Sequence, residues 1–540
     1  MTRHSSDPVA EAPSPDDCLS IIETGDRAVA SGDSVGPSLS RKRGRVRAVL
    51  SVLMVGFIVV STAVPTEAAD RETVSFVQET LTELGYDPGP IDGAWGGRTR
   101  SALNAFRASK GLEEARELTG SSLYLLHREA PGEVTLPRPG EILEGFSERA
   151  AYLAANPDVR SRHCNNRLQL EPAQPDWTPV RSFTEGRITG GGGGYISDAD
   201  DWFSPLSEGL VVSGAQCLQG LTTSCETVWT LAEAHARDNA LQTSVARRRN
   251  SEAYDGVAWI GNTVLASLIV NSAIAADRLD LSIAVQAPVL DWLYDRVNAF
   301  NYISRARTDA QSRFNSVARN HAMAAVLPSM LLGAWIGDRE LYDRGRPQYE
   351  AALANMRPDG SFPTETQRGS RALHYTGLML SYLTAMAEVA KAQGDDLYGI
   401  ESPSSLDLHD AVAFNTRGWQ DWNGVVLPYA QANHAAPKTP TSPMAGAFEL
   451  NHGWLPTYLR RFPDHPNVSA MKNATLDPVV CSPDHVADGR SHEWWCRSLS
   501  RPVSYAAMLR PGNQDIAVSS HLMGFNSGCM LATNDVVLEE

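Results

Sequence analysis

The sequence predicts a mainly helical protein: a large α/α barrel preceded by a small helical unit. From about residue 144 onward, helix-forming segments follow one another and strand-like alternation is scarce. Some of these segments are apolar nearly all round and others only on one face, as expected for the inner and outer helices of a ring. A separate helical pattern spans residues 77–112 and is followed by a stretch rich in Pro and Gly. We therefore expect two folded parts.

The length, composition and charge of the chain limit the classes of protein to which it can belong. A chain of 540 residues has room for two or three domains, and 42% hydrophobic with 20% charged residues is the composition of a globular protein. The formal charge of −16 argues against nucleic acid as a partner, because nucleic-acid binding needs a basic face. It does not exclude an anionic sugar, which a few arginines in a cleft can bind.

The first 69 residues have the pattern of a targeting segment. Basic residues gather between positions 41 and 47, and residues 48–64 are mostly apolar. Small residues follow, so cleavage near Ala68 is expected, while an uncleaved membrane anchor stays open as the alternative. Either way, basic residues before the apolar stretch place the rest of the chain outside the cytoplasm.

The cysteines suit an exported protein. Cys18 lies in the leader, and the even number of remaining cysteines favours disulfides. Cys217 and Cys225 are the easiest local pair, and Cys481 with Cys496 is a second guess. The sequence has no CxxC pair, so neither a zinc site nor another metal centre is expected.

The small unit begins with apolar residues at helical spacing, then has turns over residues 86–97, and then a second helix that stops near Gly111. Its core, LGYDPGPIDGAWGGRTRSALNAF, resembles the peptidoglycan-binding domain of the bacterial three-helix type. The resemblance implies cell-wall attachment, with Trp95, Arg98 and Thr99 as candidate contacts. The alternative is a module that kept this fold but binds something else. We place the domain at residues 70–127 and a linker at residues 128–143.

Two stretches of the large part, residues 144–540, carry candidate chemistry. ARNHAMAAV places Asn320 beside His321 in small, apolar surroundings, where such a pair is usually a hydrogen-bonded core pair. In DGSFPTETQRGSRALHY, Asp359 opens a turn, and Arg368 and Tyr375 lie seven residues apart. These two can face one cleft if the following helix starts early.

Together these stretches are similar to the alginate lyase family, whose fold is an (α/α) toroid. In that family an Asn-His pair lies on an inner helix, and a loop of the form DGxxPxExxRGxRAL leads into a helix with a catalytic tyrosine. The resemblance covers roughly residues 318–399. It implies that Asn320, His321, Arg368 and Tyr375 are catalytic and that alginate or another polyuronate is the substrate. Together with the leader, this predicts a protein that acts in the periplasm or is anchored facing it.

The chemistry of these side chains supports that assignment. Eliminating a 4-linked uronate removes the proton at C5, which is acidic only once the adjacent carboxylate is neutralised. A guanidinium and an amide, Arg368 and Asn320, are suited to that task. Tyr375 would act as base and then as acid, with a nearby cation favouring its ionised form. His321 would help to neutralise the carboxylate or act as base on the other face. No cofactor is needed.

Other residues are candidates for substrate contact. A run of five glycines ends at Tyr195 and is either a flexible linker or a mobile lid. Arg371 lies four residues before Tyr375 and shares its helical face, whereas His374 should point away. Trp419 and Trp422 would stack on sugars or pack in the core.

Two other classes of function remain open. One is a non-catalytic protein that binds cell wall or exopolysaccharide on a lyase scaffold. The other is a glycoside hydrolase with Glu365 as its acid, although no second carboxylate is evident to complete the pair. We expect membrane contact only if the N-terminal stretch stays as an anchor.

Overall fold

We describe the fold from a computed structural model. The residues it describes are 71–157, 182–184, 187–189, 196–243, 252–310, 319–369, 372–430, 453–473, 475–476, 503–504 and 523–530. All of them belong to one compact unit that spans Ala63–Glu540. The N-terminal leader, with its apolar stretch, lies outside the described residues. None of the helices in the described part of the chain has the length and apolarity needed to cross a membrane.

The N-terminal part consists of three short helices, α1 (Arg71–Glu83), α2 (Gly97–Ser109) and α3 (Gly120–Glu129). Their shared core includes Val77, Leu81, Leu103 and Phe106, all almost fully buried. Between α1 and α2 the chain makes tight turns, and a Cβ at Gly93 would lie 2.7 Å from a backbone oxygen of α1. The predicted three-helix unit is therefore present.

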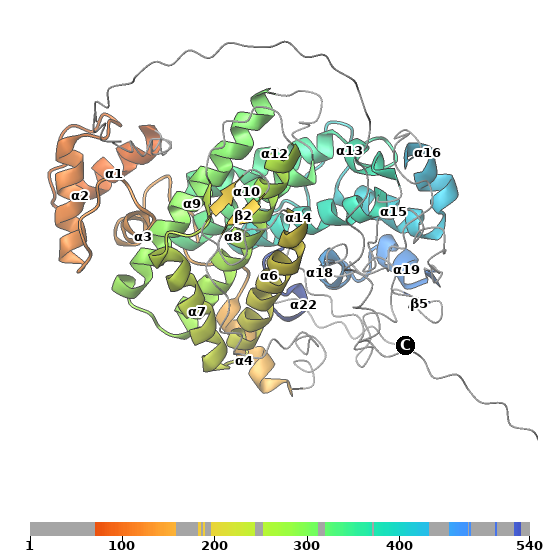
Figure 1. The fold of residues 1–540 in the computed structure, drawn as a ribbon, viewed down its shortest axis with the longest axis horizontal. Coiled ribbons are helices and arrows are strands. Elements are labelled where there is room, and N and C mark those ends of the chain that lie inside the picture. The colour runs from red at the N-terminus through yellow and green to blue at the C-terminus, as the bar shows by residue number, and fades with distance from the viewer. Residues whose placement is uncertain are drawn as a thin grey trace, which may run out of the picture. The chain divides into compact units, whose positions relative to one another are not determined.

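The large part is built mainly from longer helices, with a few short ones between them (Figure 1). In chain order these are α4 (Phe146–Ala155), α6 (Ile196–Leu218), α7 (Thr222–Arg237), α8 (Glu252–Arg278), α9 (Ile283–Ala310), α10 (Asn320–Ile336), α11 (Arg339–Asp343), α12 (Gly345–Ala354), α13 (Pro363–Thr366), α14 (Ala372–Gln393) and α15 (Leu408–Gln420). Shorter elements follow: η3 (Trp422–Val426), α16 (Leu427–Ala430), α18 (Trp454–Arg461), α19 (Pro466–Asn473) and α22 (Ser527–Met530).

The strands are few and short. Strands β1 (Ser182–Thr184), β2 (Arg187–Thr189) and β3 (Gln242–Thr243) form a sheet of order β2-β1-β3, with β2 antiparallel and β3 parallel to β1. Strands β4 (Thr475–Leu476) and β5 (Val503–Ser504) pair antiparallel. The mainly helical fold class is thus confirmed.

Helices α8, α10 and α14 form the interior of the large part. Helix α10 packs against α8, α9 and α14, and α14 in turn packs against α15 and α18. Nearly every described side chain of α10 and α14 is buried, because both sequences are apolar all round. By contrast, α7 and α15 bury one face only. The predicted division into inner and outer helices matches this arrangement.

Two sequence expectations concern the periphery. The Cys217–Cys225 disulfide joins α6 to α7, as predicted, whereas Cys481 and Cys496 lie outside the described residues. Residues 128–143, which we expected to be a linker, lie against the large part. Leu136, Ile142 and Leu143 in this stretch are almost fully buried, because three apolar side chains among the Pro and Gly residues give the stretch a surface to bury.

Candidate active site

Asn320 is the first residue of α10 and is held by Glu365 from α13. The backbone N–H of Asn320 donates to Glu365 Oε1 at 3.0 Å, and its side-chain Nδ2 donates to Oε2 at 2.7 Å. Both residues are 1% exposed. A carboxylate at the N-terminus of a helix also interacts favourably with the helix dipole. Glu365 thus fixes the orientation of the Asn320 amide.

His321 lies next to Asn320 and is stacked on an aromatic ring. Its imidazole lies on the indole of Trp259 from α8, with ring centroids 5.9 Å apart and planes 23° apart. The indole N–H of Trp259 donates to the hydroxyl of Tyr382 at 2.8 Å. Tyr382 is on α14, seven residues after Tyr375 and so on the same face of that helix. His321 is therefore tied, through Trp259, to the face of α14 that carries Tyr375.

The loop between α12 and α14 has the predicted turn. The Ser361 N–H donates to Asp359 Oδ1 at 3.0 Å, and Gly360 has φ +85°. A Cβ at Gly360 would lie 2.3 Å from the Asp410 backbone oxygen, so only glycine fits there. The other Asp359 oxygen accepts from the Tyr429 hydroxyl at 2.7 Å. These contacts fix the loop that leads to Arg368.

Arg368 and Tyr375 are in contact, but by a different route from the one expected. Helix α14 begins at Ala372, so Arg368 precedes it and does not share its face. The guanidinium carbon of Arg368 nevertheless lies 4.0 Å from the centroid of the Tyr375 ring. The expectation that the helix starts early is wrong, since Arg368 lies in a bend and the positive φ of Gly369, +61°, does not belong to an α-helix. The long, flexible arginine side chain closes the gap.

His374 lies closer to Tyr375 than its position on the helix suggested. The two rings meet edge to face, with centroids 4.9 Å apart and planes 84° apart. We expected His374 to point away, since neighbouring helical residues diverge by about 100°. Large rings on adjacent residues can still touch near the start of a helix, and here they do.

These contacts link the four predicted catalytic residues into one set. Asn320 is bound to Glu365, and Arg368 follows Glu365 by three residues and donates its backbone N–H to the Glu365 carbonyl at 3.2 Å. Arg368 covers Tyr375, while His321 reaches the Tyr375 face of α14 through Trp259. Among the described residues, no group of three or more His, Cys, Asp and Glu side chains is placed to hold a metal ion.

Of the predicted substrate-contact residues, only Trp419 and Trp422 lie among the described residues. Tyr195 and Arg371 lie outside the described residues. Trp419 is 9% exposed and stacks on Trp454, with ring centroids 6.2 Å apart, so it packs in the interior. Trp422 is half-buried and packs against the hydrophobic core.

The candidate contacts of the small unit also differ from one another. Arg98 is exposed and forms an ion pair with Asp87 at 2.6 Å. Trp95 is half-buried. Thr99 is 2% exposed, and its hydroxyl donates to the Pro88 carbonyl at 3.1 Å and accepts from Gln78. Thr99 therefore belongs to the interior of the unit, while Trp95 and Arg98 remain predicted contacts.

Glu365, Trp259 and Tyr382 were not predicted to support the site. Glu365 is part of the loop motif, but as a residue type it suggested only an acid. Trp259 is 62 residues before His321, and no local pattern connects the two. Only the packing of α10 against both α8 and α14 brings these side chains together.

Comparison with known proteins identifies both parts of the chain. Residues 223–423 match the family model described as "Alginate lyase", and residues 70–114 match the one described as "Putative peptidoglycan binding domain". Residues 223–423 of the large part are thus similar to the alginate lyase family, and residues 70–114 of the small unit are similar to the peptidoglycan-binding family.

A relative and two solved structures give the extent of the likeness. A "Polysaccharide lyase" of Stenotrophomonas maltophilia is 29% identical over 146 residues, which are 26% of this chain and 44% of the relative. The match therefore spans less than half of that relative. Two structures of alginate lyase A1-III complexed with tetrasaccharide are 17% and 19% identical, each with TM-score 0.50. They cover 63% and 64% of this chain and 92% of theirs, and the enzyme comes from Sphingomonas species A1. At this identity they support the fold alone.

Proposed function

We propose that this protein is an exported polysaccharide lyase that cleaves a 4-linked polyuronate, with alginate as the first candidate, by β-elimination. The observation that carries the proposal is the connected set Asn320, Glu365, Arg368 and Tyr375. It lies within the segment that matches the alginate lyase family. The tetrasaccharide in the A1-III structures supports an oligosaccharide as the ligand of this fold.

Neutralisation of the uronate carboxylate is the first step. Arg368 supplies a guanidinium, which pairs with a carboxylate through two parallel hydrogen bonds. The Asn320 amide gives one N–H to Glu365 and has a second to donate to the substrate. His321 lies beside it as a further donor. Neutralising the carboxylate makes the C5 proton more acidic and stabilises the enolate-like intermediate.

Proton transfer is assigned to Tyr375. Acting as a phenolate in this step, its oxygen takes the proton from C5, while the Arg368 guanidinium lies over the same ring. The electron pair left at C5 forms the C4–C5 double bond as the bond from C4 to the glycosidic oxygen breaks. The same tyrosine then returns the proton to that leaving oxygen. The products are one new reducing end and one unsaturated uronate end.

The small unit is proposed to attach the enzyme to peptidoglycan, with Trp95 and Arg98 as surface contacts. Its family match supports this role. We further propose that the leader directs the chain to the periplasm, either cleaved near Ala68 or retained as an anchor.

The hydrolase alternative is disfavoured by the position of Glu365. Both of its oxygens accept hydrogen bonds from Asn320, and the residue is buried. A general acid must present a proton to the glycosidic oxygen, and a carboxylate engaged in this way is poorly placed to do so. The non-catalytic alternative is left to the experiment.

Ultraviolet absorbance of unsaturated uronate ends tests the proposal. Purified protein would be incubated with alginate, its mannuronate-rich and guluronate-rich fractions, and other polyuronates, beside Tyr375→Phe. We expect absorbance to rise with the wild type on at least one polymer, and the variant to be about 10²- to 10⁴-fold slower. A folded wild type that binds polymer without absorbance would support the non-catalytic role. Saturated products would support a hydrolase, and full activity in the variant would exclude Tyr375 as the base.

A further inference from the structure

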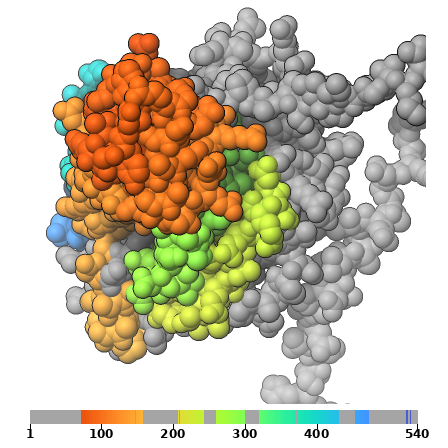
Figure 2. Space-filling view, turned by 90° about the vertical axis from the view of Figure 1, so that its left-hand side faces the viewer, coloured from red at the N-terminus to blue at the C-terminus, as the bar shows by residue number. Residues whose placement is uncertain are grey.

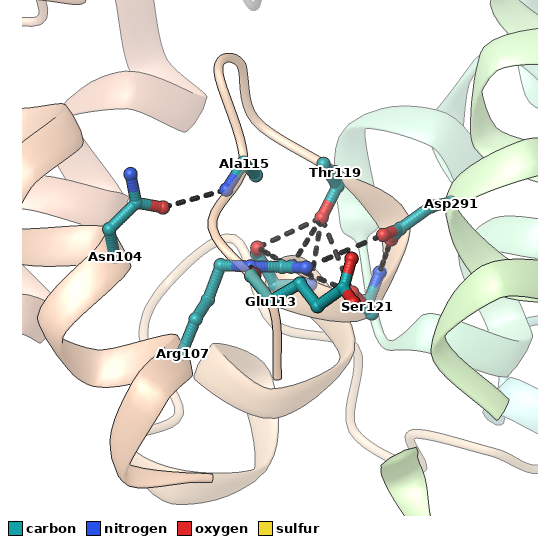
Figure 3. Close-up of polar contacts among 8 residues, drawn as sticks. Asn104, Arg107, Glu113, Ala115, Thr119, Ser121 and Asp291 are labelled. Carbon is teal, nitrogen blue, oxygen red and sulfur yellow. Dashed lines mark hydrogen bonds and ion pairs between the residues drawn. The ribbon is translucent and has the colours of Figure 1, made fainter. Parts of the chain in front are cut away.

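The N-terminal unit is locked to the large part of the chain by a buried arginine. Arg107 of α2 is 4% exposed, and its NH1 donates to the hydroxyls of Thr119, Ser121 and Ser122 at 2.8 Å each (Figure 3). The Asp291 carboxylate from α9 lies 3.6 Å from its NH2 and accepts from the Ser121 N–H at 2.8 Å.

The surfaces at this junction fit closely. A Cβ at Gly120 would lie 2.4 Å from the Leu290 backbone oxygen, so α3 approaches α9 at a position where no side chain fits. A second contact joins the Thr73 hydroxyl of α1 to the Glu340 carboxylate of α11. Figure 2 shows the N-terminal residues, in red and orange, directly against the green helices of the large part. The N-terminal unit is therefore packed against the large part, and is not joined to it by a linker alone.

Residues 120–143 of this N-terminal part form the docked segment. It ends at the C-terminus of α10, the helix that starts with Asn320 and His321. The last carbonyls of a helix have no partner within the helix. Here they accept from the N-terminal segment. The Gly140 N–H donates to Ala334 O at 2.8 Å, and the Leu136 N–H donates to Gly337 O at 2.9 Å. Between them, Arg128 donates to Trp335 O at 3.3 Å and to Ile336 O at 3.5 Å.

Arg128 is itself fixed in place. Its guanidinium carbon lies 3.6 Å from the Tyr124 ring centroid, and its NH1 also donates to the Tyr124 carbonyl at 3.3 Å. Gly140 leaves room for it, since a Cβ there would lie 2.8 Å from the guanidinium. A cation at a helix C-terminus interacts favourably with the helix dipole.

Helix α10 is therefore held at each end by a charge from elsewhere in the chain. Glu365 accepts at its N-terminus, and Arg128 donates at its C-terminus. Between these ends nearly every side chain of the helix is buried, and closely packed interiors transmit strain. We propose that Arg128 is a positioning residue, and that the docked N-terminal segment, residues 120–143, sets the position of Asn320 and His321 by capping the far end of their helix.

Substituting Arg128 tests this proposal. Of the measurements in the test, only the activity depends on the proposed function. Arg128→Met removes the charge and all three hydrogen bonds, two of them to α10, but keeps an alkyl chain. Arg100→Met is the matched control, because Arg100 is an exposed arginine of the same unit. The readouts are backbone amide hydrogen exchange across α10, and kcat and KM separately.

We expect Arg128→Met to speed exchange at residues 320–324 as well as at residues 333–337, and to lower kcat about 2- to 30-fold with KM changed less. Arg100→Met should change neither. Faster exchange confined to residues 124–140 and 333–339, with kcat as in the wild type, would overturn the proposal.

A second variant and a measurement that needs no substrate keep the test decisive. Arg128→Lys keeps the charge but not the planar donor, and should give a smaller change of the same kind if Arg128→Met does not fold. The exchange experiment needs no substrate. It therefore decides the positioning role even if the protein cleaves none of the polymers, which would be a failure of the proposed function and not of this inference.

Discussion

The carboxylate of Glu365 receives both the backbone and the side-chain N–H groups of Asn320, at 3.0 and 2.7 Å. One acidic residue thereby joins the start of α10 to the loop that carries Arg368. The dyad and the arginine come from segments 48 residues apart in the sequence, so this pair of bonds holds the candidate site together.

Glu365→Gln should destabilise the protein by about 1.5–3 kcal/mol and lower kcat. A hydrogen bond to a charged group contributes about this much, and the glutamine NH2 would face one of the Asn320 donors. Urea unfolding and the absorbance assay measure the two effects. Glu350→Gln, at an exposed ion pair with Arg346, is the control. Equal stability of the two variants would contradict a linking role for Glu365.

Arg368→Lys should lower kcat/KM about 10²- to 10³-fold, the usual cost of removing one preorganised donor of an anion-stabilising site. A lysine keeps the charge but neither the planar contact with Tyr375 nor the two-pronged grip on a carboxylate. Arg417→Lys serves as the control, because Arg417 is exposed and binds the Asp359 carbonyl of the same loop. If both variants keep wild-type kcat/KM, Arg368 does not bind the substrate carboxylate.

Trp259→Leu should lower kcat about 2- to 10-fold, since an aromatic pair contributes about 0.5–1.5 kcal/mol and the stack orients His321. Tyr382→Phe removes the hydroxyl that accepts from the indole N–H and lies 3.4 Å from the Thr263 hydroxyl, but it leaves the stack in place, so it should have a smaller effect. Imidazole signals in NMR spectra of both variants report whether the His321 environment has changed. An unchanged kcat in Trp259→Leu would argue against a role for the stack.

His127→Gln should change the dependence of stability on pH. Burial, with the nearby Arg128 charge, lowers the pKa of His127 from 6.5 to about 3. The folded state therefore disfavours protonation of His127. The free energy of unfolding that neutral His127 contributes above pH 6.5 is lost as the pH falls. That loss amounts to about 2 kcal/mol between pH 7 and 5. The variant should lack it, as urea unfolding at several pH values would show.

Asp338→Asn should produce the opposite change. Burial raises the pKa of Asp338 from 3.8 to about 7, so the folded state binds the proton more tightly and gains stability as the pH falls from 7 towards 4. Removing this group should make acid more harmful than in the wild type. Parallel pH profiles for the wild type and both variants would refute the two shifts.

Local patterns predicted much of this fold. Helix α8 was evident because its sequence is apolar nearly all round, and α14 because it is long and ends with Lys391 and Gly394. The turn at Asp359 and Gly360 was evident because few residue pairs favour a turn so strongly. The Cys217–Cys225 disulfide was predicted from a separation of only eight residues.

Contacts between distant segments could not be predicted in the same way. Trp259 meets His321, and Arg128 meets Trp335, only after whole helices have packed. The composition of residues 128–143 suggested a free linker, because Pro and Gly content says nothing about the surface that Leu136 and Ile142 cover. The route from Arg368 to Tyr375 was also missed, since it depends on a side-chain rotamer and not on helical spacing.

The docking of residues 128–143 has a mechanical consequence. A free segment of this length extends to about 50 Å, and would absorb any pull on the N-terminal unit as slack. Here its backbone N–H groups and Arg128 are bonded to the last turn of α10. Tension applied to the N-terminal unit is therefore borne by the Arg107–Asp291 junction and by α10 itself, so that a load on this unit reaches the helix that begins with Asn320 and His321.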